Sequence, residues 1–160
     1  MNLNALLSEQ AKIVTGFAPA VPSSSTPDYV SLKNYEKLTV IIIADNATSV
    51  TGSAITLKQA TAVAGSGEKA LAFDTMYANE DTAAGDTLTE TAVSSDTFTT
   101  DDTDNKNLLY VIEVDAEDLD TENGFDCVRV GTGNAAASAI GVIYILWGQR
   151  YSTQPSAIVD

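Results

Sequence analysis

The sequence has no histidine and a single cysteine, Cys127, among its 160 residues. Without histidine, neither a Ser-His-Asp nor a Cys-His arrangement is available to activate a nucleophile. Zinc sites need histidine or several cysteines, and an intrachain disulfide needs a second cysteine. Cys127 stands between strand-forming residues, where a free cysteine is typically an inert buried thiol. We therefore expect a protein that is not an enzyme and that carries no cofactor.

Basic residues are also scarce, with 8 Lys and Arg against 22 Asp and Glu, and the net charge is -14. Residues 74–126 hold sixteen of the acidic residues and one basic residue, Lys106. Proteins that bind nucleic acid need clustered Lys and Arg, so we expect no nucleic-acid partner. An acidic surface can simply keep a protein soluble. A sharper hypothesis is that residues 74–126 stay in water while another face is docked.

Long apolar runs are absent too. A transmembrane helix needs about 20 apolar residues, and the longest candidate, Ile140–Trp147, has eight residues. The N-terminus lacks a basic stretch followed by a long apolar core, so no signal peptide is predicted. We expect a soluble chain with no membrane partner.

Three apolar runs predict the middle of a β-sheet. Ile140–Trp147 is uncharged and rich in β-branched and aromatic residues, which is typical of a strand buried on both faces. Leu108–Val114 is its most plausible neighbour, and Leu38–Ile43 is the third strand. After residue 28, period-two alternation and frequent turn signals continue to the end of the chain. The sequence thus predicts an all-β fold, an antiparallel β-sandwich of seven to eight strands, for which a jelly roll is one arrangement.

The N-terminal segment has a different pattern. Residues 2–14 show helical spacing of apolar residues, and residues 16–27 contain three of the four prolines and three consecutive serines. We therefore divide the chain into residues 1–27, an N-terminal docking arm with a Pro/Ser linker, and residues 28–160, the β-sandwich domain. A helix this short is marginal in water and needs a surface, which is either the protein's own core or a partner.

Other motifs give weak signals. The acidic stretch Asp115–Gly124 lacks the glycine and glutamate positions of a calcium-binding EF-hand loop, so a solvated turn is favoured and an irregular calcium site stays open. We commit to no metal site. Tyr144, Trp147 and Tyr151 fit either a sugar-stacking platform or the core, and core packing is the commoner role of aromatics at strand spacing.

Several sequence segments resemble those of a family of tailed-bacteriophage head decoration proteins, also called capsid-stabilising or cement proteins. They are Lys12–Pro19, Asp28–Tyr35, Ile55–Ala60, Val111–Asp115, Gly124–Arg129 and Pro155–Ile158. The order and spacing of these segments are similar over nearly the whole chain, and residues 78–105 are the least similar. None of the segments is a catalytic motif.

The resemblance implies a structural virion protein that binds the outer surface of a phage capsid and bridges subunits of the major capsid protein. It also implies manufacture in the host cytoplasm, a place on the outer capsid surface, and a homo-oligomer for which a trimer is favoured, with the C-terminal strand region at or near the contact. On the predicted arm, the capsid-docking residues would be Leu3, Leu6, Leu7, Ile13, Val14 and Phe17.

Two other hypotheses remain open. One is a virion or cell-surface adhesin module that binds glycans. The other is a small carboxylate-dependent hydrolase, which would require two carboxylates converging in a pocket.

Overall fold

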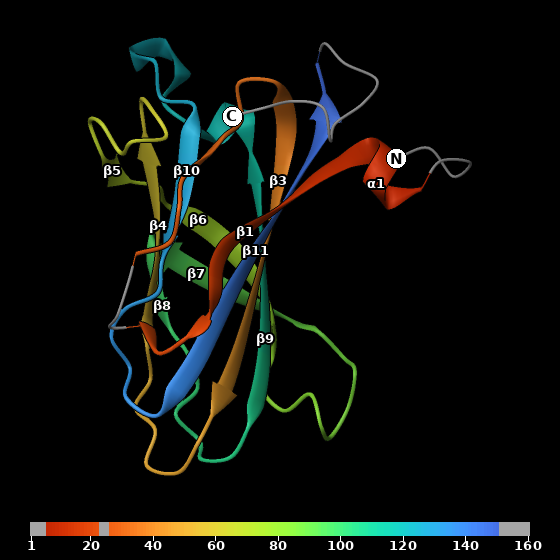
Figure 1. The fold of residues 1–160 in the computed structure, drawn as a ribbon, viewed down its shortest axis with the longest axis vertical. Coiled ribbons are helices and arrows are strands. Elements are labelled where there is room, and N and C mark those ends of the chain that lie inside the picture. The colour runs from red at the N-terminus through yellow and green to blue at the C-terminus, as the bar shows by residue number, and fades with distance from the viewer. Residues whose placement is uncertain (1–5, 23–25, 151–160) are drawn as a thin grey trace.

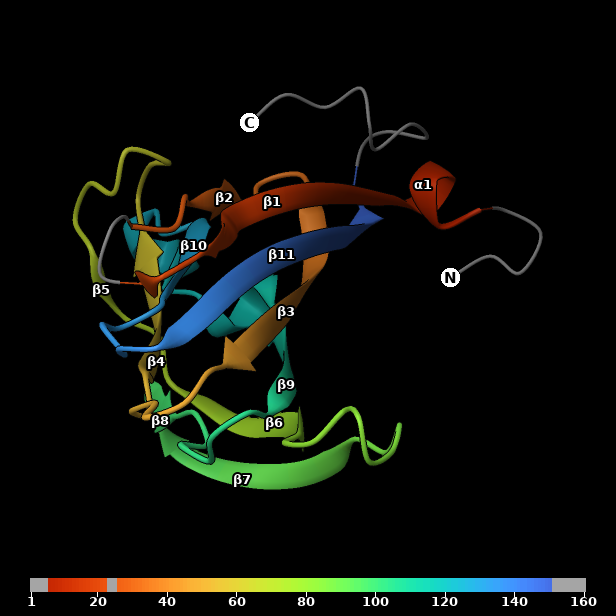
Figure 2. The ribbon, with the colours of Figure 1, turned by 60° about the horizontal axis from the view of Figure 1, so that its bottom comes forward.

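The computed structural model describes residues 6–22 and 26–150. Within these residues, eleven strands form two antiparallel sheets that pack as a sandwich (Figures 1 and 2). The predicted all-β sandwich is confirmed. Three short helices complete the described elements, and they are α1 (Leu7–Gln10), η2 (Ala116–Asp118) and η3 (Thr121–Asn123).

The larger sheet, called here the large sheet, has six strands in the order β1-β11-β3-β9-β6-β7. Their bounds are β1 Ala11–Ala20, β11 Ser138–Gln149, β3 Tyr35–Asn46, β9 Asn107–Asp115, β6 Phe73–Asn79 and β7 Thr89–Ser95. The small sheet has the order β2-β10-β4-β5, and a fifth strand, β8, also pairs with β4. Its strands are β2 Val30–Ser31, β10 Cys127–Gly131, β4 Ala54–Ala60, β5 Lys69–Ala70 and β8 Thr97–Thr99.

The prediction of seven to eight strands was too low for identifiable reasons. Residues 69–79 hold two strands, β5 and β6, in place of one continuous strand, and residues 89–99 likewise hold β7 and β8. The remaining extra strand is β1, which lies where the sequence pattern predicts a helix and a linker.

The core lies between the sheets and follows the period of two. On β3 and β11, alternate residues such as Leu38, Val40, Ile140 and Val142 are fully buried. Two buried tyrosines, Tyr110 and Tyr144, have partners for their hydroxyl groups, and the Tyr110 hydroxyl accepts a hydrogen bond of 2.9 Å from the Asp101 N–H. The Tyr144 hydroxyl accepts a hydrogen bond of 2.9 Å from the Val130 N–H, so a strand of one sheet is tied to the other.

The helix predicted over residues 2–14 and the linker predicted from residue 16 are wrong where β1 lies. In the described part of that stretch, residues 6–14, only Leu7–Gln10 is helical, and β1 pairs with β11 from Ala11↔Trp147 to Ala20↔Ile140. The consecutive β-branched residues Ile13, Val14 and Thr15 favour a strand, and β11 offers a free edge that a helix would leave unpaired. The docking arm and linker therefore contain an edge strand of the sandwich.

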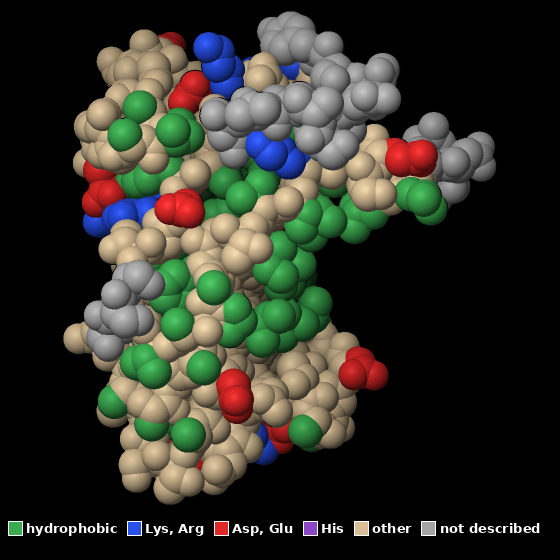
Figure 3. Space-filling model, in the orientation of Figure 1, with side chains coloured by type: hydrophobic (Ala, Val, Ile, Leu, Met, Phe, Trp, Pro, Cys, Tyr) green, Lys and Arg blue, Asp and Glu red, His purple; other side chains and the backbone are tan. Residues whose placement is uncertain are grey.

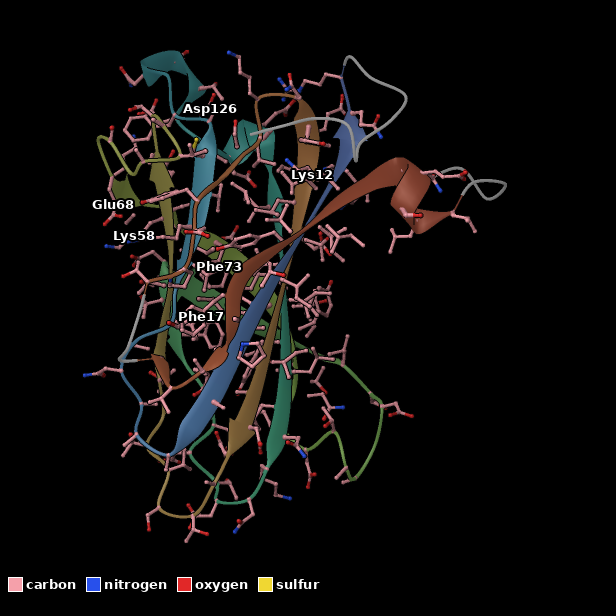
Figure 4. All side chains as sticks on the ribbon, viewed as in Figure 1. Lys12, Phe17, Lys58, Glu68, Phe73 and Asp126 are labelled. Carbon is pink, nitrogen blue, oxygen red and sulfur yellow. The ribbon has the colours of Figure 1, made fainter. Side chains whose placement is uncertain are left out.

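Close packing shows that β1 is integral to the fold. Phe17 is 7% exposed within the core cluster, and Figure 4 shows it between the sheets. A Cβ at Gly16 would lie 2.2 Å from Cε2 of Tyr144, so only glycine fits over that ring. Pro19 falls near the end of this edge strand, where a missing N–H is tolerated.

Two expectations about the central strands are also corrected. β3, and not β9, lies directly beside β11, because β11 pairs with β3 along its length and β9 pairs with β3 on the other side. In addition, β11 is buried on its inner face only. Its outward side chains Ile143, Ile145 and Trp147 are partly exposed.

Candidate docking face

The outward side chains of the large sheet form rows across the strands, which we call the outer face. One row, read from the pairing register, is Ile13, Ile145, Thr39 and Glu113 on β1, β11, β3 and β9. The next row is Thr15, Ile143, Ile41, Val111 and Tyr77, which adds β6. With neighbouring strands about 4.8 Å apart, the second row spans roughly 19 Å.

The outer face is aliphatic yet accessible. Ile13 is 53% exposed, Ile43 is 49% exposed and Tyr77 is 36% exposed, while Ile41, Ile143 and Ile145 are half-buried by their neighbours. Figure 3 shows hydrophobic side chains gathered along the hollowed side of the molecule below α1. Contiguous exposed apolar surface is a feature of interaction sites, whereas single exposed apolar residues are ordinary.

Helix α1 lies at the start of β1 (Figures 1 and 2), and its exposed leucines add to the apolar surface. Leu6 is 71% exposed and Leu7 is 43% exposed, and none of the helix residues is buried. The turn is closed locally, because the Leu6 N–H donates a 2.8 Å hydrogen bond to Oε2 of Glu9. The helix therefore presents leucine side chains without a core role.

The six predicted docking residues fall into three groups. Leu6, Leu7 and Ile13 are exposed. Val14 is partly buried against the core, and Phe17 lies inside it. Leu3 lies outside the described residues. The structure thus leaves Leu6, Leu7 and Ile13 accessible, and it adds β3, β9 and β11 side chains that the sequence prediction did not include.

A polar network crosses the outer face. The Trp147 indole Nε1–H donates to Oγ1 of Thr39 at 3.1 Å, and the Thr39 hydroxyl donates to Oε2 of Glu113 at 2.8 Å. Desolvation by the surrounding protein raises the pKa of Glu113, although the Thr39 hydrogen bond acts in the opposite direction. Lys37 forms an ion pair with Asp115, and the hydrogen bond in that pair raises the pKa of Lys37.

Beside the outer face is a cleft of about 460 Å³. β6 pairs with β9 only from Tyr77↔Val111 to Asn79↔Leu109, and beyond Val111 the two strands separate. Figure 2 shows β6 and β7 crossing below β9. The residues that line the cleft are Leu71, Ala72, Phe73, Asp74, Thr75, Tyr77, Glu90, Glu113, Val114 and Asp118.

The outer face of the small sheet has a different chemistry. Glu68 accepts hydrogen bonds from Nζ of Lys58 at 2.5 Å, from Nη2 of Arg129 at 2.6 Å and from the Tyr29 hydroxyl at 2.5 Å (Figure 4 labels Lys58 and Glu68). The Lys58 and Tyr29 hydrogen bonds lower the pKa of Glu68. Burial and the bond to Glu68 raise the pKa of Tyr29. We call this arrangement the Glu68 clamp, and it holds the surface of β4 and β10 together.

Other predicted site residues are separated by the fold. Tyr144 points into the core and Trp147 points outward, so they do not share a platform, and Tyr151 lies outside the described residues. Cys127 is buried, as predicted. Within residues 6–22 and 26–150, no group of three or more Cys, Asp or Glu side chains is placed to hold a metal ion. Over the same residues, no helix is long and apolar enough to cross a membrane.

All sixteen acidic residues of 74–126 are at least partly exposed. They do not all lie apart from the apolar surface, because Asp74, Glu90, Glu113 and Asp118 line the cleft beside it. Sequence reasoning missed this cleft, since its members come from four separate segments of the chain.

No protein-family model matches the sequence, and no curated protein matches it. Among solved structures, the crystal structure of SPBc2 prophage-derived protein YomS is similar, with a TM-score of 0.45 and 14% identity. The alignment covers 85% of this chain and 91% of that chain. At this level of similarity, no function is carried over from that protein to this chain.

Proposed function

We propose that the chain is a structural virion protein that binds the outer surface of a phage capsid and stabilises it by bridging subunits of the major capsid protein. The observation that carries the proposal is the partly exposed aliphatic outer face of the large sheet, with Leu6 and Leu7 beside it. The resemblance to head decoration proteins supports the choice of partner. The docking surface is this outer face together with α1.

The chemistry of the outer face suits docking without catalysis. Fully burying a large aliphatic side chain contributes about 1.5–3 kcal/mol, so side chains that are half exposed, such as Ile13 and Ile43, contribute roughly half of that on contact. The free energy gained from the contacts of a single outer face must also offset the loss of translational and rotational freedom on binding. A trimer, which is part of the proposal, would present three faces to the shell at once and raise the overall affinity.

Stabilisation of the shell then follows from mass action. A protein that binds the assembled capsid and has no affinity for free subunits favours assembly by an amount set by its concentration and affinity. The exposed acidic residues of 74–126 oppose association with nucleic acid, which agrees with a location outside the shell.

A glycan-binding adhesin module is the second candidate function. The observation that favours it is the cleft, which combines carboxylates with the exposed Tyr77 ring. Carbohydrate binding by the purified protein, lost on Tyr77→Ala, would support the adhesin over the capsid protein.

The test of the capsid proposal is cosedimentation of the purified protein with empty, expanded phage heads. The double variant Ile13→Ser/Ile43→Ser removes two exposed side chains of the outer face. Val63→Ser is the matched control, because Val63 is 47% exposed on the loop after β4. We expect at least tenfold weaker binding for the double variant and no change for the control, with melting temperatures close to that of the wild type.

Two results would count against the proposal. If the wild-type protein does not bind heads, the capsid function is wrong. If the double variant binds as tightly as the control, the protein docks by another surface.

A further inference from the structure

The cleft beside the outer face has an apolar floor and an acidic rim. Leu71, Phe73 and Val114 are core residues that are 3%, 8% and 3% exposed, so they form the floor. The carboxylates come from different segments, and they are Asp74 on β6, Glu90 on β7, Glu113 on β9 and Asp118 on η2. Each is exposed to solvent, so they form the rim.

Several lysines form ion pairs with carboxylates outside the rim. Lys37 pairs with Asp115, and its charge also acts on Glu113 and Asp118. Lys69 pairs with Asp120 and Lys106 pairs with Asp81. Within residues 6–22 and 26–150, none of the four rim carboxylates forms an ion pair. Four negative charges around the cleft outnumber the one positive charge of Lys37 that acts on two of them, so the local field attracts a further positive group.

An apolar floor with a negative rim fits a side chain that is itself apolar along its stem and positive at its tip. Lysine and arginine have this form, since their methylene groups pack on apolar surface while the charged group stays near water. The Tyr77 ring lies at the same opening and adds a site for a cation over an aromatic face. A second copy of this chain fits poorly, because its net charge of -14 would repel the rim.

The cleft is continuous with the docking face. Tyr77 belongs to the row that contains Ile41 and Val111, and Glu113 belongs to the row that contains Ile145. A partner surface that covers the aliphatic rows thus brings its adjoining residues directly over the cleft.

We propose that the cleft receives a lysine or arginine side chain of the capsid subunit whose apolar surface packs on the outer face. This inference rests on the proposed function and names the chemistry of the partner, which is an apolar patch with a basic residue at its border. The cation fixes the orientation of the protein on the shell, because the acidic cleft lies at one side of the outer face, where β6 borders β9. Binding should accordingly weaken as salt is added.

The test uses two double variants that change the net charge equally. Glu90→Gln/Glu113→Gln neutralises two rim carboxylates with little change of shape. Glu117→Gln/Glu122→Gln neutralises two exposed acids that do not line the cleft. For the rim variant, we expect at least tenfold weaker binding to empty heads at low salt and a clearly flatter salt dependence. The control variant should behave like the wild type.

A second readout does not need heads. A fluorescent hexa-arginine peptide measured by anisotropy should bind the wild type and the control alike, and the rim variant several-fold more weakly. Equal peptide binding by all three proteins would overturn the cation site, whatever the heads show.

The outcomes separate the two levels of the argument. If the wild type binds heads but the rim variant keeps the same affinity and salt dependence, the inference fails and the capsid function stands. If peptide binding depends on the rim but no protein binds heads, the capsid function fails and the cleft remains a cation site. If a neutral oligosaccharide such as chitotriose displaces the peptide from the cleft, the site is a glycan site and the inference is overturned.

Discussion

The two sheets have inner faces of the same kind and outer faces of opposite kinds. Ile42 on β3 and Leu57 on β4 are both fully buried between the sheets. On the outside, the large sheet presents Ile41, Ile43 and Ile145, whereas the small sheet presents threonines and the Glu68 clamp. An outer face needs no apolar residues for folding, as the small sheet demonstrates. The aliphatic outer face of the large sheet therefore points to a partner.

The large sheet includes β1 as an edge strand, and removing β1 should have the largest effect on stability. A chain that begins at Thr26 lacks the strand that pairs with β11 and lacks Phe17 from the core. Replacing a buried phenylalanine by alanine alone costs about 3–5 kcal/mol, which is a large part of a typical domain's stability. We expect urea unfolding to show loss of most of the free energy of unfolding.

A chain that begins at Gln10 is the matched control. It keeps β1 and removes Leu6 and Leu7, which are not buried. Its unfolding midpoint should stay close to that of the full chain while its binding to heads weakens. An unchanged midpoint for the shorter chain that begins at Thr26 would mean that β1 is not integral to the sandwich.

Adjacent residues of β3 test the inner and outer faces directly, and this effect is the next largest. Ile42 is fully buried and Ile43 is 49% exposed. Ile42→Ala should lower the free energy of unfolding by about 2–5 kcal/mol because it leaves a cavity. Ile43→Ala should lower it by less than about 1 kcal/mol. For binding to heads at a temperature where both variants are folded, the order should be reversed, with the larger loss for Ile43→Ala.

The sequence identified the strands of this core well, because Leu38–Ile43 and Ile140–Trp147 are long enough for the pattern to be unambiguous. It did not identify β1. The partner of Ala11 is Trp147, far along the chain, while the spacing of Leu3, Leu6 and Leu7 matched a helix locally. Propensity over a short window loses to tertiary pairing in such cases.

The sequence pattern of the docking face allows two interpretations, which are burial inside this chain and burial against a partner. In Val40-Ile41-Ile42-Ile43, apolar residues occupy both faces of the strand, which predicts burial on both sides. The sequence does not show whether the outer face of the strand is buried by the same chain or by a partner. The cleft could not be predicted for another reason. Glu90 and Glu113 line the same cleft because β6 separates from β9 in the folded protein.

On the small sheet, Glu68→Gln should have an intermediate effect on stability and none on docking. The substitution weakens hydrogen bonds from Lys58, Arg129 and Tyr29. Hydrogen bonds to charged groups contribute about 1.5–3 kcal/mol, and since the Glu68 side chain is 30% exposed we expect a loss of about 1–2 kcal/mol.

The pH dependence of this effect has a definite sign. Because the pKa of Glu68 is lowered in the folded protein, the clamp stabilises the fold above the ordinary glutamate pKa of about 4.3. That stability is lost as the pH falls through the lowered pKa. The difference between wild type and variant, measured by thermal unfolding, should be constant near neutral pH and shrink in acid. A variant that loses head binding at neutral pH would contradict the separation of the two outer faces.

Glu113→Gln on the large sheet should have the smallest effect on stability, with the opposite sign. Desolvation raises the pKa of Glu113, so the folded state disfavours the carboxylate relative to the unfolded state. Protonated Glu113 contributes to the stability of the fold, and this contribution is fully present below the ordinary glutamate pKa of about 4.3. It is lost as the pH rises through the raised pKa of Glu113. At pH 7, a neutral glutamine that still accepts the Thr39 hydrogen bond should therefore be slightly more stable, by less than about 0.5 kcal/mol. The gain should vanish at pH 3, where both side chains are neutral. Thermal unfolding at the two pH values measures the difference. A clear destabilisation at pH 7 would mean that a cation of this chain already holds Glu113, and the cleft would then have no free charge to offer a partner.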